Sequence, residues 1–590
     1  MKLASRTARA RARRTQLRHT AADTDTVPSA LQPRSTKPPA RERALLAPTA
    51  DRVIPDLLHA DPSISVDEPA LLHSLAFAFV AGSANGALRG TLARTAIAPS
   101  TFAPDSLQDG LFIDELIAIA FEFQNAGKPA PLDRAQLRKW LTRPPSDARD
   151  VELRQAVLRE LTAQPALQTS LERLYAAIAT LPELLDAEGA DARLDENHWR
   201  IDVLQALRKA FAALSDDFAN SQSALARLAQ FGEHVRKTLG YEQLTALLDF
   251  EADCARADLQ VTLGADGHIR SLAIVGLRER KDSPLYVRPV QRFLRRVWAF
   301  LQGYTLGPHE VVDRWLEVVW NGVLAYLPAL LQLKAELEFY LGALHFKRLA
   351  EDKGLHVCLP ELVHDTQVTA PKQLQALWNP LLLSQGNAPI ATELALPSFR
   401  YTCITTGPNS GGKTRFLQAL ALCQLLGQAG MFVPARAAHV RLVAGMFVSL
   451  GEAPLADQKE GRLGMELTRI RALFEQARGG SFVILDELCS GTNPSEGEEI
   501  FRMLLELLHE LEHEVHITTH FLSFAHGLQN EAAALGLSFL QVELDENEQA
   551  TYRFVPGVAS TSLAQQTARR LGVTREQLRE LIRKRESAAQ

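Results

Sequence analysis

Eight consecutive residues, GPNSGGKT, combine the glycines, the lysine and the hydroxyl group that bind a polyphosphate. They fit the pattern G-x-x-x-x-G-K-[ST] at every fixed position and follow the short apolar run 401–404. A strand, a glycine-rich turn and a helix N-terminus in this order surround a phosphate chain with backbone N–H groups. Lys413 would add a mobile positive charge, and the Thr414 hydroxyl would bind Mg²⁺. The predicted cofactors are therefore ATP and Mg²⁺. The expected phosphate-binding residues are Gly407, Pro408, Asn409, Ser410, Gly411, Gly412, Lys413 and Thr414.

Two adjacent carboxylates follow a short apolar run about seventy residues after the phosphate-binding motif. Four apolar residues precede Asp486 and Glu487, which is typical of a buried strand of a parallel sheet. Such a strand delivers its last residues to the edge of the sheet where ligands bind. Asp486 is therefore expected to hold Mg²⁺, and Glu487 to orient or deprotonate the attacking water. The alternative is a pair of charges that only ends a strand, and the phosphate-binding loop upstream favours the nucleotide site.

A turn and another strand complete the pattern. The segment 490–497, SGTNPSEG, is placed like the D-loop of ABC-type ATPases. The residues 514–520 are interpreted as a strand that ends in His520, which could contact the γ-phosphate and act in catalysis with Glu487 and Lys413. His516 is the weaker candidate because it lies inside this strand.

Taken together, these motifs resemble the MutS family of DNA-repair ATPases. The Pro-Asn pair inside the phosphate loop is the form typical of that family, and Phe-Val-Pro-Ala at 432–435, Asp-Glu at 486–487 and Thr-His at 519–520 also match. The segment 377–381 is similar to the family's short "HP-L" motif, although Asn379 stands where His is usual. The Gly-Thr pair at 491–492 is closer to the branch of the family that lacks mismatch recognition. The resemblance is strong over 355–590, weak over 150–350 and not visible before 150.

Two departures limit what the resemblance implies. The family's signature loop carries a Ser-Thr-Phe-like triplet that reaches the ATP of a partner subunit, whereas here Gly461-Arg462 precedes Leu463, Gly464 and Met465. No mismatch-reading wedge and no Smr nuclease segment is recognisable. The resemblance implies a homodimer that closes on ATP and switches its grip on structured or damaged DNA, without reading mismatches.

Composition is that of an ordinary soluble protein. The net charge of −5 excludes a polycation, so any surface for nucleic acid must be local. The five cysteines have no paired spacing, which favours a reducing compartment over a disulfide framework or a zinc site. We expect a cytoplasmic protein, with nucleoid association possible and no membrane span. The basic, acid-free segment 1–19 is interpreted as a disordered tail, with a mitochondrial-type presequence as the alternative.

The predicted fold is an α/β P-loop (ABC-type) ATPase domain that follows a mainly α-helical core and lever domain. Apolar residues at helical spacing before residue 250 indicate packed helices, and the segment 257–277 alternates like a β-hairpin. That hairpin is either a reduced DNA clamp or an ornament of the helical domain. Arginines at 288, 292, 295 and 296 form either a phosphate-binding face or a solvated one. The predicted domains are a disordered tail (1–55), a helical region (56–150), a core and lever domain (151–353) and the ATPase domain (354–590).

The C-terminal residues 560–583 are interpreted as two short helices with Thr574 as an N-cap, in the position of the family's dimerisation element. A helix-turn-helix DNA reader is the alternative. For the whole chain, the main hypothesis is an ATP-dependent DNA-binding switch, and the alternative is an ATP-gated protein-interaction module that does not bind DNA. A transporter ATPase is disfavoured because an LSGGQ-type signature is missing.

Overall fold

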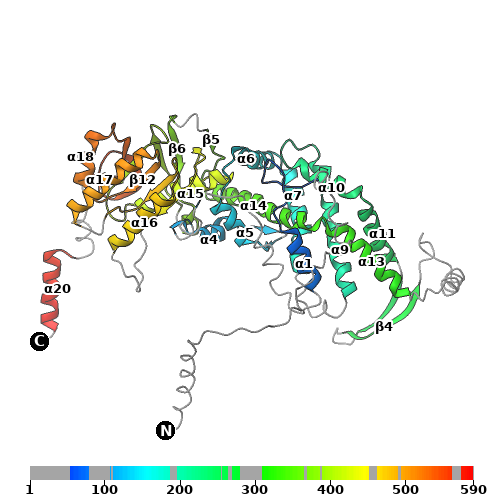
Figure 1. Ribbon diagram of the computed structural model, residues 1–590. Helices are drawn as coiled ribbons and strands as arrows, with labels where there is room; N and C mark the ends of the chain where they lie inside the picture. Colours follow the sequence, from blue (N-terminus) through cyan, green and yellow to red (C-terminus); the bar gives the residue numbers. More distant parts are fainter. Residues whose placement is uncertain are drawn as a thin grey trace, which may run out of the picture. The chain divides into compact units, whose positions relative to one another are not determined.

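Figure 1 shows the computed structural model of the protein. The structure describes residues 53–78, 102, 107, 110–125, 127–185, 196–214, 216–253, 256–263, 269–278, 308–364, 369–385, 388–450, 462–489, 493–560 and 573–588. The described residues belong to one compact unit, 51–590. The predicted tail up to residue 52, the arginines at 288–296, the signature-loop segment 451–461 and the Gly-Thr pair at 491–492 lie outside the described residues.

The first part of the chain is helical, as the spacing of its apolar residues predicted. Its helices are α1 (Glu68–Ala78), α4 (Ile113–Leu116), the π-helical turn η3 (Ile117–Phe121), α5 (Arg134–Thr142), α6 (Ala148–Ala163), α7 (Pro165–Ile178), α8 (Leu181–Leu185), α9 (Glu196–Ala213), the 3₁₀ turn η4 (Asp216–Phe218), α10 (Ala226–Arg236), α11 (Leu239–Asp253), α13 (Pro308–Leu324) and α14 (Leu327–Asp352). Pro182 lies in the first turn of α8, where a missing N–H is tolerated.

Helix α14 is the central helix of this part and is buried on nearly all sides. Figure 1 shows it among α5, α6 and α7, which it contacts. The buried carboxylates on α14 have partners: Glu336 accepts the Leu57 N–H at 2.8 Å, and Glu338 accepts the Tyr175 hydroxyl at 3.1 Å. Buried polar groups are tolerated when they are hydrogen-bonded in this way. Pro328 again lies in the first helical turn, so α13 and α14 are separate helices.

Buried Arg154 on α6 joins the helical part to the rest of the unit. Its Nε donates to the Leu58 carbonyl and one terminal nitrogen donates to the Ala429 carbonyl, both at 3.0 Å. Ala429 is the last residue of α15 (Lys413–Ala429), so a positive charge lies at the negative end of that helix dipole. The Gln428 side chain also donates to the Pro145 carbonyl at 3.2 Å. The C-terminal end of α15 is therefore bonded directly to the helical part.

Two small antiparallel ladders accompany the helices. The predicted hairpin at 257–277 is confirmed as β3 (Arg256–Leu263) paired with β4 (Ile269–Arg278). The second ladder pairs β1 (Gln124–Asn125) with β2 (Lys128–Pro129). Gly127 has a φ of 76° between these strands, which is the left-handed conformation that a tight turn requires.

The second part of the chain is built on a six-stranded sheet in the order β10-β11-β12-β8-β13-β14. Its strands are β8 (Thr402–Thr406), β10 (Met446–Ser449), β11 (Phe482–Leu485), β12 (Glu514–Thr518), β13 (Leu537–Leu544) and β14 (Ala550–Pro556). All neighbours are parallel except β13 and β14. Every residue of β8, β11 and β12 is buried, as expected for strands covered on both faces.

Helices cover one face of this sheet, and α15 lies against the other. The first face packs on α16 (Arg462–Gln476), α17 (Pro494–Glu510) and α18 (Leu522–Leu528), and Figure 1 shows α17 and α18 beside β12. Successive side chains along a strand point to opposite faces of the sheet. Val483 and Ile517 pack in the cluster with α16, α17 and α18, whereas Cys403 and Ile484 pack in the larger core with α15. The carboxyl ends of the parallel strands meet at one edge of the sheet, where the candidate site lies.

A smaller four-stranded sheet has the order β5-β9-β6-β7. It consists of β5 (Glu361–Val363), β6 (Lys372–Leu377), β7 (Thr392–Leu396) and β9 (Ala437–Arg441), with the 3₁₀ turn η6 (Pro380–Ser384) between β6 and β7. The 3₁₀ turn η7 (Gln529–Glu531) precedes β13, and α20 (Arg575–Ala588) is the last described helix. Thr574 accepts the Gln577 N–H at 3.3 Å, which confirms the predicted N-cap.

No single helix in the described ranges has the length and apolar character of a membrane span. The end of α13 (from Trp315) and the whole of α14, which are bent by 49° relative to each other, meet both criteria only as a pair.

Candidate nucleotide-binding site

The loop after β8 has the backbone geometry of a phosphate cradle. Gly407 has a φ of 143° and Gly412 a φ of 88°, and a Cβ on Gly407 would lie 2.6 Å from Cγ2 of Val542. Ser410 also has a positive φ of 65°. Only glycine fits such close backbone approaches at low cost. The loop turns directly into α15, whose first residue is Lys413, so the N-terminus of a long helix faces the cradle.

The Lys413 ammonium group is folded over the cradle. Its Nζ donates to the carbonyls of Gly407 and Pro408, both at 3.0 Å, and the residue is 5% exposed. Burial lowers the pKa of Lys413, and the nearby charges of Glu487 and Asp486 act in the opposite direction. An anion in the cradle would therefore meet a desolvated cation that is hydrogen-bonded to two neutral carbonyls.

Asp486 connects the strand β11 to the P-loop helix. The Thr414 hydroxyl donates to Oδ2 of Asp486 at 2.7 Å, and the Thr518 hydroxyl donates to Oδ1 at 2.5 Å. Thr518 Oγ1 in turn accepts the Glu487 N–H at 2.7 Å. One hydroxyl at the end of β12 thus fixes both carboxylate residues. A hydroxyl and a carboxylate in contact are the hard oxygen donors that Mg²⁺ prefers, so this pair fits a magnesium ion.

Glu487 and His520 form the outer part of the site. Nε2 of His520 lies 2.8 Å from Oε1 of Glu487, and the two side chains are 28% and 31% exposed. Glu487 has a φ of 53°, which is uncommon for a residue with a side chain and turns the chain sharply after Asp486. The strand β12 ends at Thr518, so His520 lies two residues beyond the strand rather than at its last position. The exposure leaves both groups accessible to a ligand.

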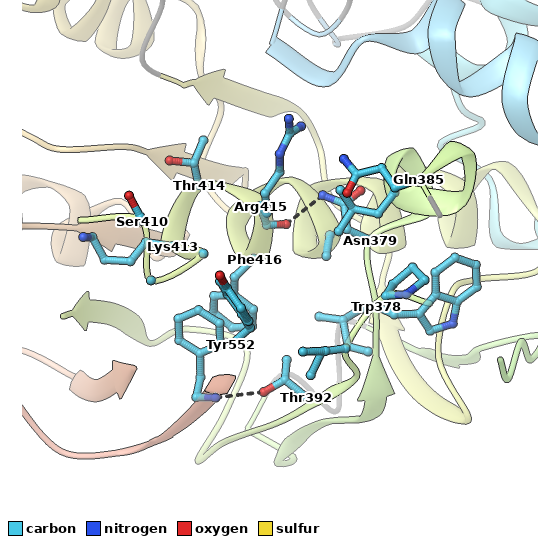
Figure 2. A pocket seen from close by; sticks show the side chains of 18 of the residues that line it. Trp378, Asn379, Gln385, Thr392, Ser410, Lys413, Thr414, Arg415, Phe416 and Tyr552 are labelled. Carbon is cyan, nitrogen blue, oxygen red and sulfur yellow. Dashed lines mark hydrogen bonds between the residues drawn. The ribbon is translucent and has the colours of Figure 1, made fainter. Parts of the chain in front are cut away.

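A cavity of about 680 Å³ extends from the cradle toward the smaller sheet. Figure 2 shows Ser410, Lys413 and Thr414 together at one end of its lining and Trp378 and Gln385 at the other. The cavity also has apolar and aromatic walls. These walls include Leu377, Pro389, Ile390, Phe416, Tyr552 and Phe554. A phosphate cradle that opens into a cavity with aromatic walls suits a polyphosphate attached to a planar base.

Two contacts shape this cavity. The rings of Phe416 on α15 and Phe554 on β14 stack with centroids 4.2 Å apart. The Asn379 side chain accepts the Leu381 N–H at 2.9 Å and donates to the Arg415 carbonyl at 2.9 Å, which Figure 2 also shows in part. Asn379, where His is usual in the family, therefore ties the turn η6 to the first turns of the P-loop helix.

The structure brings together the five residues to which the sequence assigned chemistry. Lys413 and Thr414 come from α15, Asp486 and Glu487 from the end of β11, and His520 from the segment after β12. The remaining cradle residues lie in the loop between β8 and α15. Asn409, Ser410, Gly411 and Gly412 line the cavity, and Gly407 and Pro408 supply carbonyls to Lys413.

Sequence reasoning missed Thr518 and the aromatic wall. Thr518 precedes the Thr-His pair at the end of a predicted strand, and that position was the one available signal. Tyr552 and Phe554 reach the cavity because β14 pairs with β13, a contact that no local motif announces. His516, the weaker candidate, is fully buried and lies 3.1 Å from Glu514, away from the cavity lining.

A second group of charges is buried between the two sheets. Nζ of Lys372 on β6 forms an ion pair with Glu514 on β12, and both residues are at most 2% exposed. Lys372 also lies over the rings of Phe399 and Phe482, at 5.6 and 5.1 Å. Burial alone would raise the pKa of Glu514, but Lys372 and His516 lower it to about 2. The Glu514 carboxylate therefore favours its ionised form, and its contact with Lys372 holds the smaller sheet to the six-stranded one.

A P-loop strand flanked by parallel neighbours, with an Asp-Glu pair at the same sheet edge, defines a P-loop domain of the ATPase class. Residues 403–585 match the family described as MutS domain V. This part of the chain therefore belongs to the MutS family, as its motifs predicted.

Three curated relatives share the name Endonuclease MutS2. That of Thermomicrobium roseum is 33% identical over 302 residues, which are 49% of this chain and 36% of the relative. That of Levilactobacillus brevis is 28% identical over 437 residues, or 70% of this chain and 50% of the relative. That of Streptococcus uberis is 29% identical over 244 residues, or 41% and 29%. The chain thus spans half or less of the length of these relatives.

Proposed function

We propose that this chain binds and hydrolyses ATP with magnesium, and that the nucleotide changes its grip on structured or damaged DNA. One observation carries the ATPase part of the proposal. Five side chains that are far apart in sequence converge on one sheet edge: Lys413, Thr414, Asp486, Glu487 and His520. Hydrolysis of a phosphoanhydride needs little covalent chemistry from the protein, so positioned charges of this kind are sufficient.

In the proposed mechanism the cradle amides and Lys413 hold the phosphates. Thr414 and Asp486, already in contact at 2.7 Å, would hold Mg²⁺. A bound Mg²⁺ would neutralise charge on the phosphate oxygens during the reaction. Thr518 keeps Asp486 oriented by donating to its other oxygen. The aromatic wall at Tyr552 and Phe554 would accept the base, which leaves the phosphates at the cradle.

Glu487 is the proposed residue that orients or deprotonates the attacking water. Its Oε1 is paired with Nε2 of His520, so one ring nitrogen faces the carboxylate. The same nitrogen cannot also contact a γ-phosphate at full strength. Phosphate contact by His520 would therefore release the Glu487 carboxylate for the water, which couples the presence of the substrate to activation of the base.

The DNA part of the proposal is supported by family membership and by the connection of the P-loop helix to the helical part. Arg154 and Gln428 bond the far end of α15 to that part, so movement at the cradle has a rigid path into the helices. The hairpin β3–β4 lies between the helices α11 and α13 in the chain and offers a site for contact with a duplex. We further propose a cytoplasmic homodimer in which the segment 451–466 of each subunit faces the other's nucleotide.

The test measures ATP hydrolysis by the purified chain with and without DNA. Lys413→Ala serves as the inactive control, and electrophoretic shifts with duplex, fork and Holliday-junction DNA are recorded with and without ATP over a range of salt. We expect DNA to stimulate hydrolysis, and binding of one DNA form to survive salt that removes non-specific attachment. Hydrolysis without any DNA binding would replace the DNA switch with an ATP-gated protein-interaction module. Absence of hydrolysis would refute the ATPase itself.

A further inference from the structure

The four residues after β11 form an unusual turn. Glu487 and Cys489 have φ values of 53° and 60°, and neither is glycine. Left-handed conformations of this kind are unfavourable for residues with a side chain and persist only where surrounding contacts enforce them. The turn lies at the sheet edge and Glu487 lines the nucleotide cavity, so its conformation decides where the carboxylate points.

All four backbone N–H groups of this turn are held from outside it. That of Asp486 donates to the Ser449 carbonyl at 2.9 Å, and the other three have partners on β12 and α16. Two are held by Thr518 on β12: its hydroxyl accepts the Glu487 N–H at 2.7 Å, and its carbonyl accepts the Leu488 N–H at 3.3 Å. The third is held by a different element. Oε1 of Glu466 on α16 accepts the Cys489 N–H at 2.6 Å. A carboxylate that accepts a backbone N–H makes a hydrogen bond of the stronger, charge-assisted kind.

Glu466 lies near the start of α16, and its bond to the Cys489 N–H is shielded from solvent. It is the fifth residue of α16, the helix that begins directly after the segment 451–461. Glu466 is partly buried and Cys489 is fully buried, so water competes little for the bond. The Glu466 carboxylate also affects the Cys489 thiol beside this bond. Burial, and then the charge of Glu466, raise the pKa of Cys489 to about 12.

We propose that Glu466 is a positioning residue for ATP hydrolysis, which fixes the turn 486–489 so that Glu487 faces the nucleotide cavity. The proposal rests on the ATPase function proposed above. In this proposal Glu466 acts on the position of Glu487 through its bond to the Cys489 N–H, and not on the nucleotide itself.

The test compares Glu466→Ala, which removes the acceptor, with Glu466→Gln, which keeps an acceptor oxygen without the charge. Glu475→Ala, on the exposed side of the same helix where Glu475 pairs with Arg471, is the matched control. For each chain, kcat and KM for ATP, the Kd for Mg-ATP by calorimetry and the melting temperature are measured. We expect Glu466→Ala to lower kcat by about 10- to 100-fold, as for a misplacement of about 1 Å, with KM and Kd within about twofold.

Glu466→Gln should recover at least about a third of the wild-type kcat, since its oxygen can still accept the Cys489 N–H. Three results would overturn the proposal: a kcat of Glu466→Ala equal to that of Glu475→Ala, a loss of ATP affinity as large as the loss of kcat, or no recovery in Glu466→Gln. If Glu466→Ala fails to fold, Glu466→Asp, which retracts the carboxylate by one methylene, replaces it as the impaired variant. The proposal is then overturned if ATP affinity falls as much as kcat, or if kcat of Glu466→Gln is no higher than that of Glu466→Asp. A wild-type chain without any hydrolysis would refute the ATPase function instead, so the two failures are distinguishable.

Discussion

Replacing Thr518 by valine should damage catalysis and stability together, because one hydroxyl serves both carboxylate residues. Valine keeps the β-branched shape in a fully buried strand position but removes a donor to Asp486 and the acceptor for the Glu487 N–H. Loss of a hydrogen bond to a charged group costs about 1.5–3 kcal/mol, and an unsatisfied buried N–H costs about 1–3 kcal/mol. Since the two terms share one hydroxyl and are not additive, we expect the free energy of unfolding to fall by about 3 kcal/mol.

The catalytic effect follows from the position of Glu487. Without the Thr518 oxygen the left-handed turn is free to relax, and a shift of about 1 Å in a catalytic group costs up to about 100-fold in rate. Steady-state ATP hydrolysis and urea unfolding monitored by tryptophan fluorescence measure the two quantities. Thr518→Ser is the control: it keeps the hydroxyl and should lose about 1 kcal/mol of stability from one buried methyl group while hydrolysing ATP at near the wild-type rate. Equal kcat for the valine and serine variants would refute the positioning role.

Four further outcomes follow from the described contacts. Lys413→Ala should abolish measurable hydrolysis and weaken Mg-ATP binding in calorimetry by about tenfold or more, because the desolvated cation of the cradle is lost; tight ATP binding would contradict this. Glu487→Ala should bind Mg-ATP with near wild-type affinity but turn it over at least about 100-fold more slowly, and turnover near the wild-type rate would remove Glu487 from catalysis. Lys372→Met should lower the free energy of unfolding by about 3–5 kcal/mol, because it leaves Glu514 as an unpaired buried charge. The double variant Lys372→Met/Glu514→Leu should recover most of that loss in urea unfolding, and a double variant no more stable than Lys372→Met would refute the explanation. His513, whose pKa is lowered to about 4 by burial and then by Arg441, is neutral in the folded state. Its contribution to stability is complete above about pH 6.5 and is lost as the pH falls from there toward 4, with a slope of at most about 1.4 kcal/mol per pH unit. His513→Gln should remove this slope from the pH dependence of unfolding, whereas the exposed-site control His526→Gln should retain it.

Local chemistry explains which parts of the site could be predicted from the sequence. The glycines at 407 and 412, the lysine and the threonine must be adjacent to form the cradle, so a short motif contains them. Asp486 and Glu487 follow a buried strand, and the rule that parallel strands end at one edge brings them to the same place. The hairpin β3–β4 was predicted for the same reason, since alternation and a turn are local signals.

Contacts that depend on strand pairing could not be predicted. Thr518 faces Asp486 because β12 lies between β11 and β8, and the sequence does not state that order. Lys372 meets Glu514 because two separate sheets pack together, although both residues look like ordinary surface charges in the sequence. The ladder of β1 and β2 leaves no signal in the sequence, because its strands have two residues each, which is too few for periodicity to show.

The two ends of α15 serve different neighbours. Its first residue belongs to the phosphate cradle and its last carbonyl accepts Arg154, which also holds the Leu58 carbonyl. Seventeen residues of helix place these ends about 25 Å apart. If α15 moves as a rigid helix toward a ligand at its first turn, the Arg154 hydrogen bonds at its last turn must change as well. The rate of hydrogen–deuterium exchange of the amides at 57–60 should therefore change when nucleotide binds, and it can be measured without a probe in the nucleotide cavity.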